Sequence, residues 1–156
     1  MLVSDIMRGD VKAADAEDTF ADVAKSMRTN GISSVVVLDK GGKLSGIPTE
    51  RDIVNLVAAG GDPHSVKVAH GMTRRDLETV SSKMDLADAA EHMVARNIRH
   101  LPVVDRGRVV GIVSIRDLTR WAADELASGA EMPDIARSHK ALQAASELQK
   151  QRRKGA

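Results

Sequence analysis

Two four-residue segments combine a hydroxyl with a carboxylate three positions later: "TERD" at 49–52 and "SIRD" at 114–117. A hydroxyl before a helix and an acid three residues on form a capping box, which satisfies unpaired N–H groups at the helix start. The same geometry could bind a ligand, because a helix N-terminus attracts phosphate and a carboxylate can accept hydrogen bonds from the hydroxyls of a ribose. The two interpretations are compatible, and the segments alone leave both open.

Both segments lie in a longer internal repeat. A shift of 65 aligns Met7 with Met72 and Asp52 with Asp117, and a shift of 66 aligns Met27 with Met93. The one-residue difference falls where "DKGGK" is matched by "DRGR", at a turn that tolerates an insertion. The repeat covers about 3–57 and 68–122, which predicts a duplicated fold.

Each copy predicts a helix with an apolar face. Apolar residues at 20, 23, 24 and 27, and again at 86, 89, 90 and 93, have the spacing of one helical face. Thr19 and Asp85 precede these helices as N-caps, and "NGI" at 30–32 supplies a glycine that ends the first.

After each helix, the pattern indicates a β-hairpin and a second helix. The β-branched segments "SSVVVLD" and "HLPVVD" lead through a turn to "LSGI" and "VVGIV", and a helix begins after Thr49 or Ser114. With short strands near "DVKAA" and "LETV", each copy has the order β-α-β-β-α. Because such a small sheet needs a partner to cover it, we expect the two copies to pack together.

Composition excludes several classes of protein. The chain has 156 residues, 42% hydrophobic and 29% charged, a net charge of +1, and only two aromatic residues, Phe20 and Trp121. The absence of cysteine excludes disulfides, zinc thiolate sites and cysteine nucleophiles. The five histidines have no metal-binding spacing, and no catalytic or phosphate-loop motif occurs. With no secretory signal and no apolar segment of about 18 residues, we expect a cytoplasmic protein without membrane attachment, catalytic residues or metal.

Five segments carry a resemblance to a known family: "DIM" at 5–7, "GISSVVVLD" at 31–39, "GIPTERDIV" at 46–54, "NIRHLPVVD" at 97–105 and "GIVSIRDL" at 111–118. Over about residues 1–127 the chain resembles a tandem CBS domain pair, or Bateman module. The resemblance implies an α+β fold of two β-α-β-β-α repeats packed as a pseudo-twofold pair. We divide the chain into repeat one at 1–62, repeat two at 63–127, and a C-terminal helical extension with a basic tail at 128–156.

The resemblance also implies a function. Many members bind an adenosyl ligand in one or two clefts between the repeats, and pairs commonly dimerise. We therefore expect a regulatory homodimer that senses AMP, ADP, ATP, S-adenosylmethionine or a dinucleotide such as NAD(H). It would have no covalent cofactor and would convey ligand occupancy to an effector protein of unknown identity.

The family's binding positions are carried over through the matching motifs. Asp52 and Asp117 match residues that hold ribose, and Thr49 and Ser114 match residues beside phosphate. The remaining matches line the adenine slot or stand at the start of the central strands: Ile32, Ser33, Ser34, Ile47, Ile98, Arg99, His100 and Ile112.

Charge distinguishes the two repeats. Arg99 and His100 stand where related members place phosphate-facing side chains, whereas Ser33 and Ser34 carry no charge. We therefore favour the cleft around Ser114 and Asp117. Pro48 removes an N–H before Thr49, so the other cleft is expected to be altered or empty.

Two alternatives remain open from the sequence. In the first, the Thr/Ser–Asp segments serve only as helix caps in a ligand-free homodimerisation or protein-interaction module. In the second, "KQRRK" at 150–154, after a helix-favouring stretch at 134–150, contacts DNA. We expect this tail to be solvated rather than bound to nucleic acid.

Overall fold

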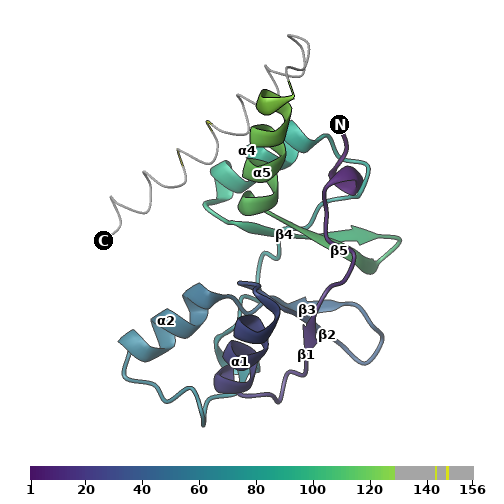
Figure 1. Cartoon of the computed structure of the whole chain (residues 1–156). Helices are drawn as coiled ribbons and strands as arrows, with labels where there is room; N and C mark the ends of the chain where they lie inside the picture. The colour runs from purple at the N-terminus through teal and green to yellow at the C-terminus, as the bar shows by residue number, and fades with distance from the viewer. Residues whose placement is uncertain (129–142, 144–146, 148–156) are drawn as a thin grey trace. The chain divides into compact units, whose positions relative to one another are not determined.

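The computed structural model describes residues 1–128 together with Gln143 and Glu147, and these form two compact units (Figure 1). Of the described residues, unit 1 contains Met1–Gly9, Thr79–Asp105 and the stretch 110–128, and unit 2 contains Asp10–Glu78 and Arg106–Val109. The predicted C-terminal extension and its basic tail lie, apart from Ser128 and the two residues just named, outside the described residues.

Unit 2 carries a three-stranded sheet and three helices. Its elements are β1 (Ala13–Ala14), α1 (Phe20–Asn30), β2 (Val36–Leu38), β3 (Leu44–Gly46), α2 (Glu50–Ala58) and the short α3 (Val68–Gly71). The strand order is β1-β2-β3, with β1 parallel to β2 and β2 antiparallel to β3. The predicted helix, hairpin and second helix of repeat one are therefore confirmed.

Local interactions fix the ends of α1 as predicted. The backbone N and Oγ1 of Thr19 donate to Asp22 Oδ2 at 3.1 and 2.6 Å, which closes a capping box. These hydrogen bonds, the side-chain one first, lower the pKa of Asp22. The helix ends at Gly31, whose φ of 63° is a conformation that glycine adopts at little cost. Its buried face supplies core residues Phe20, Val23 and Met27.

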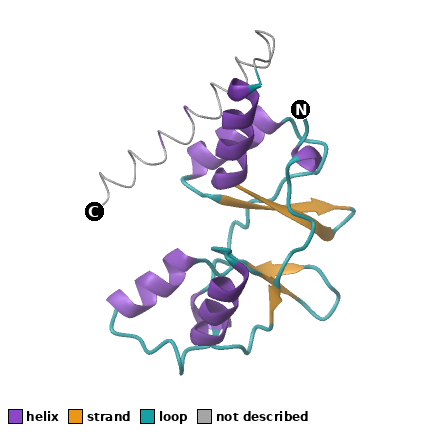
Figure 2. Ribbon diagram, in the orientation of Figure 1, coloured by secondary structure: helices purple, strands orange, loops and turns teal. Residues whose placement is uncertain are grey.

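Unit 1 is built from a 3-10 turn, a two-stranded ribbon and two helices. Its elements are η1 (Val3–Asp5), α4 (Leu86–Arg96), β4 (His100–Asp105), β5 (Arg108–Ser114, whose first two residues belong to unit 2) and α5 (Ile115–Ala127). Figure 2 shows α4 and α5 side by side on one face of the ribbon. The core between them is apolar and centres on fully buried Leu86, Met93, Leu101 and Leu118.

One predicted strand is reduced to a single bridge. The segment "LETV" contributes only Val80, which pairs in parallel with Val103. Val80 N donates to Pro102 O, and Val104 N donates to Val80 O. Continuing this ladder toward Glu78 would require an N–H at position 102, which proline lacks. The strand therefore stops where Pro102 ends the hydrogen-bond pattern.

The N-terminal segments of the two repeats are exchanged between the compact units. Val3, from repeat one, is fully buried in the core of unit 1, and its counterpart Val68 is fully buried in unit 2. Met7 packs on Gly111 and Met72 packs on Gly46 in the same way, with the methionine sulfur 2.6 and 2.4 Å from where a Cβ would lie. The packing therefore follows a different division of the chain from the boundaries 1–62 and 63–127, which stay a prediction for the duplication.

Candidate functional site

The segment 114–117 forms the junction of β5 and α5. Ser114 is the N-cap of α5; its N and Oγ both donate to Asp117 Oδ2, and its Oγ accepts from Asp117 N at 3.4 Å. Asp117 keeps only 8% of its surface exposed. A buried carboxylate is costly unless hydrogen bonds and opposite charge compensate it, so the capping box stabilises both the helix start and the charge.

A residue from the N-terminal segment completes the compensation of this charge. Arg8 Nε donates to Asp117 Oδ1 at 3.2 Å, in an ion pair whose side chains are 41% and 8% exposed. Arg8 is held in place through its backbone, because Arg8 and Ile112 exchange two N–H···O bonds of 2.9 and 3.0 Å. Each oxygen of the Asp117 carboxylate therefore has a distinct partner: Ser114 on one and Arg8 on the other.

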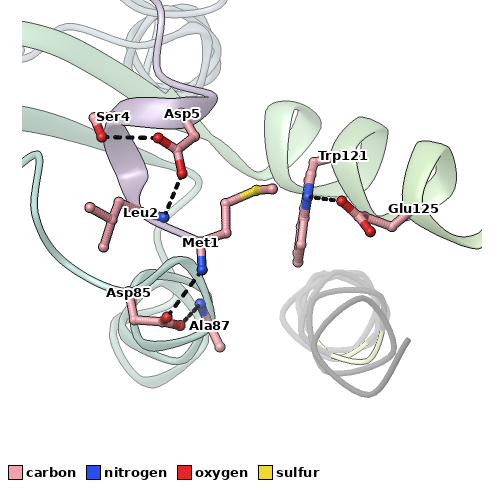
Figure 3. Close-up of polar contacts among 8 residues, drawn as sticks. All are labelled: Met1, Leu2, Ser4, Asp5, Asp85, Ala87, Trp121 and Glu125. Carbon is pink, nitrogen blue, oxygen red and sulfur yellow. Dashed lines mark hydrogen bonds and ion pairs between the residues drawn. The ribbon is translucent and has the colours of Figure 1, made fainter. Parts of the chain in front are cut away.

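This carboxylate borders a cavity of about 330 Å³ within unit 1. The cavity is lined by Ile6, Arg8, Asp117, Arg120, Trp121 and Asp124. The last four follow one face of α5, and Trp121 is held there by its Nε1–H, which donates to Glu125 Oε1 at 3.2 Å (Figure 3). The volume lies in the range of sites for small molecules, and the lining combines apolar surface with fixed charges of both signs.

The matching segment in unit 2 has the same capping box but a different neighbour. Thr49 N and Oγ1 donate to Asp52 Oδ2, both at 2.7 Å, at the start of α2. Ile47 pairs with Thr73, as Ile112 pairs with Arg8. Thr73, which is neutral, therefore occupies in unit 2 the position that Arg8 has in unit 1. The two motifs thus differ in the charge of the residue beside them.

The strand starts lie beside the helix starts of their own repeats. Arg99 O accepts from Ile115 N at 3.0 Å, and Ser33 O accepts from Glu50 N at 3.1 Å. The side chains of Arg99 and His100 are half-buried. The structure thus brings Arg99, which we predicted to face phosphate, next to the Ser114–Asp117 segment.

Four other predicted positions are buried or pack against the cores of the two units. Ser34 and Ile47 are each 7% exposed. Ile32 and Ile98 pack against the edges of the cores of unit 2 and unit 1, where their N–H groups also close the ends of α1 and α4. These contacts give the four residues a structural role, and their contact with a ligand stays a prediction.

Sequence reasoning missed Arg8 and the α5 residues Arg120, Trp121 and Asp124. The repeat alignment pairs Arg8 with Thr73, so the charge difference is visible in the sequence. The ion pair that Arg8 forms is not visible in the sequence, because Arg8 and Asp117 are 109 positions apart and meet only through the exchange of the N-terminal segments.

The described residues also bear on metal binding and on membrane insertion. Among them, no three His, Asp or Glu side chains gather closely enough to hold a metal ion. None of the helices within this part of the chain combines the length and apolar character required to cross a bilayer.

Comparison with known proteins identifies the family. The CBS domain profile matches twice, over residues 3–59 and 68–124, which together cover most of the chain. The chain belongs to the CBS domain family. These two matches coincide with the duplicated segments, so the tandem CBS pair expected from the sequence is confirmed, as is its α+β fold.

Three CBS relatives illustrate the similarity. An uncharacterized protein of Methanopyrus kandleri is 36% identical over 74% of this chain, and the match spans 60% of that protein. The CBS domain-containing protein YhcV of Bacillus subtilis is 29% identical, with 85% of this chain and 94% of YhcV covered. A solved CBS domain pair in complex with 5′-methylthioadenosine and S-adenosyl-L-methionine is 30% identical, covers 80% of this chain and 98% of its own, and has a TM-score of 0.74.

Proposed function

We propose that this CBS pair is a regulatory module that binds an adenosyl ligand at the Ser114–Asp117 motif and conveys its occupancy to a partner protein. The observation that carries the proposal is a buried carboxylate, Asp117, at a helix start beside a cavity of about 330 Å³. The hydroxyls of a ribose can donate to this carboxylate, and the start of α5 favours a nearby phosphate. The adenosyl compounds held by the similar CBS pair support this ligand class.

The regulatory step is a coupling between ligand and partner. A ligand that prefers one conformation of the pair shifts the population toward that conformation. A partner that binds the same conformation then binds more tightly, and the partner raises the affinity for the ligand by the same factor. The chemistry at the site is binding rather than turnover, because hydrogen bonds to ribose and phosphate require no residue to transfer a proton or form a bond.

Thermal unfolding in the presence of AMP, ADP, ATP, S-adenosylmethionine and NADH tests the proposal. A ligand at about 100 times its Kd adds roughly 2.7 kcal/mol of stability, which raises the Tm by a few degrees in a chain of this size. Asp117→Asn should abolish that rise, because the amide of asparagine is uncharged and has only one acceptor oxygen, whereas the carboxylate has two.

Asp22→Asn is the matched control. Asp22 closes an equivalent capping box with Thr19 at the start of α1, and it does not line the cavity. Both variants should lower the Tm of the free protein, since each weakens one cap, and Asp117→Asn should lower it more because it also weakens the ion pair with Arg8. Only Asp117→Asn should remove the ligand effect. If the wild type gains no stability from any of these ligands, adenosyl binding is contradicted.

Homodimerisation is a second candidate, favoured by one surface. α2 exposes two apolar side chains, Val54 at 63% and Val57 at 55% of their surface. In the second repeat, α5 corresponds to α2, and the residue that matches Val57 is Ala122, which is fully buried. Sedimentation equilibrium of the wild type and of the double variant Val54→Glu, Val57→Glu tests it. A wild-type dimer that becomes a monomer in the variant supports homodimerisation through Val54 and Val57. A monomeric wild type contradicts homodimerisation.

A further inference from the structure

A ribose bound at Asp117 would lie directly beside Arg8. One carboxylate oxygen, Oδ2, already accepts from the backbone and hydroxyl of Ser114, which hold the start of α5. The other, Oδ1, accepts from Arg8 Nε. Because breaking the Ser114 bonds would undo the helix cap, a ribose hydroxyl would bind Oδ1, which can accept a second hydrogen bond beside that of the guanidinium.

Arg8 can contact a ligand anion while it stays at the site. Its backbone is fixed by the two hydrogen bonds with Ile112, while its side chain is 41% exposed and has room to rotate. A guanidinium has five N–H donors and stays charged at any physiological pH, and the contact with Asp117 uses only the one on Nε. Arg8 is therefore a cation at the cavity with four donors left for an anion.

The charge of the ligand decides whether that anion is supplied. We infer that Arg8 is a specificity-determining residue, which selects phosphate-bearing adenosine nucleotides over uncharged adenosyl compounds at the Ser114–Asp117 motif. This inference rests on the proposed function. A 5′-phosphate would accept from the remaining donors of Arg8 and form a charge-assisted pair with it. A neutral thioether such as 5′-methylthioadenosine offers Arg8 no anion.

The remaining charges of the cavity set where the phosphate lies. Arg120 follows Asp117 by three positions on α5 and adds a second cation, whereas Asp124 adds an anion one turn further along. A phosphate is therefore attracted to the Arg8 and Arg120 end of the cavity and repelled from the Asp124 end. In unit 2 the position of Arg8 is Thr73, so the same selection is not expected at the Thr49–Asp52 motif.

Isothermal titration calorimetry with AMP and with 5′-methylthioadenosine tests the inference. The variant Arg8→Thr installs the residue that unit 2 has at this position, and Arg8→Lys keeps the charge without the fork of donors. Lys83→Thr is the control, since it removes one positive charge from an exposed position of the same unit outside the cavity. Circular dichroism of each variant establishes that it is folded before titration.

The wild type should bind AMP at least tenfold more tightly than 5′-methylthioadenosine. Arg8→Thr should reduce this ratio at least tenfold, with the affinity for the neutral compound unchanged or raised. Arg8→Lys should keep most of the preference, and Lys83→Thr should keep all of it.

Other results would overturn the inference in distinguishable ways. An Arg8→Thr ratio within twofold of the wild type, or a gain in affinity for both ligands, would overturn the selection by Arg8 and leave adenosyl binding intact. If the wild type binds neither compound, the proposed function fails, and the inference fails with it.

Discussion

At the scale of single residues, aspartates fix the loops and helix starts of this CBS pair by accepting hydrogen bonds from backbone and hydroxyl groups. Asp39 holds a turn through the N–H groups of Gly41 and Lys43, and Asp22 and Asp117 close capping boxes. Only Asp117 is both buried and beside the cavity. The same local chemistry therefore serves structure at several places and ligand binding at one proposed place.

Asp105 gives a prediction about acid stability. Hydrogen bonds from the side chain and backbone of Ser82, with a further one from Ser81, lower the pKa of Asp105 from its ordinary value of 3.8. A lowered folded-state pKa contributes stability above pH 3.8, and this contribution is lost as the pH falls through the folded-state value. Asp105→Asn should therefore be less stable than the wild type at pH 7, and the difference should shrink below pH 3.8.

Urea unfolding at a series of pH values measures this difference. Asp10→Asn is the control, because the Asp10 side chain is 84% exposed and a surface substitution changes stability by less than about 0.5 kcal/mol. A gap between Asp105→Asn and wild type that stays constant from pH 7 to below pH 3.8 would contradict the role given to these hydrogen bonds.

At the scale of elements, the crossing of the N-terminal segment over β5 depends on Gly111. A Cβ at this position would lie 2.6 Å from Met7 Sδ and 3.2 Å from Arg8 O. Met7 can move but the backbone carbonyl of Arg8 is paired with Ile112, so we expect Gly111→Ala to destabilise the protein by about 1–3 kcal/mol.

Gly9→Ala is the matched control for this prediction, since a Cβ there meets no heavy atom within 4 Å. It should change the free energy of unfolding by less than about 0.5 kcal/mol. Denaturant unfolding of both variants decides the matter. Equal stability of the two would mean that the segment shifts freely and that Gly111 is not needed for the crossing.

Elements with local signals were predictable and elements set by long-range pairing were less so. Thr19, Asp85 and Gly31 mark the ends of α1 and α4 through caps that a short stretch of sequence encodes. The short strand predicted near Val80 is a single bridge, because its length depends on whether residue 102 has an N–H to offer. The Ser114–Asp117 box was predictable and its Arg8 partner was not, because the box is local and the ion pair is not.

At the scale of the whole molecule, the duplication and the compact units divide the chain differently. Each unit takes its N-terminal apolar anchor from the other repeat, as the positions of Val3 and Val68 show. Because the two repeats offer similar surfaces, each N-terminal segment could pack on either unit. The repeat pattern therefore does not determine which unit it packs on. The clefts expected between the two repeats stay a prediction.

The exchange gives a prediction that separates the two divisions. Val3→Ala removes two methyl groups from a fully buried site and should cost about 2 kcal/mol. Although Val3 belongs to repeat one, the loss should fall on the core of unit 1. Amide hydrogen exchange should therefore accelerate in α4 and β4 more than in α1 and β2. Val68→Ala, at the equivalent position and equally buried, should produce the opposite pattern. Because the two substitutions are chemically identical, any difference in which amides exchange faster reports the packing of the segments. Faster exchange in α1 after Val3→Ala would show instead that each repeat keeps its own N-terminal segment.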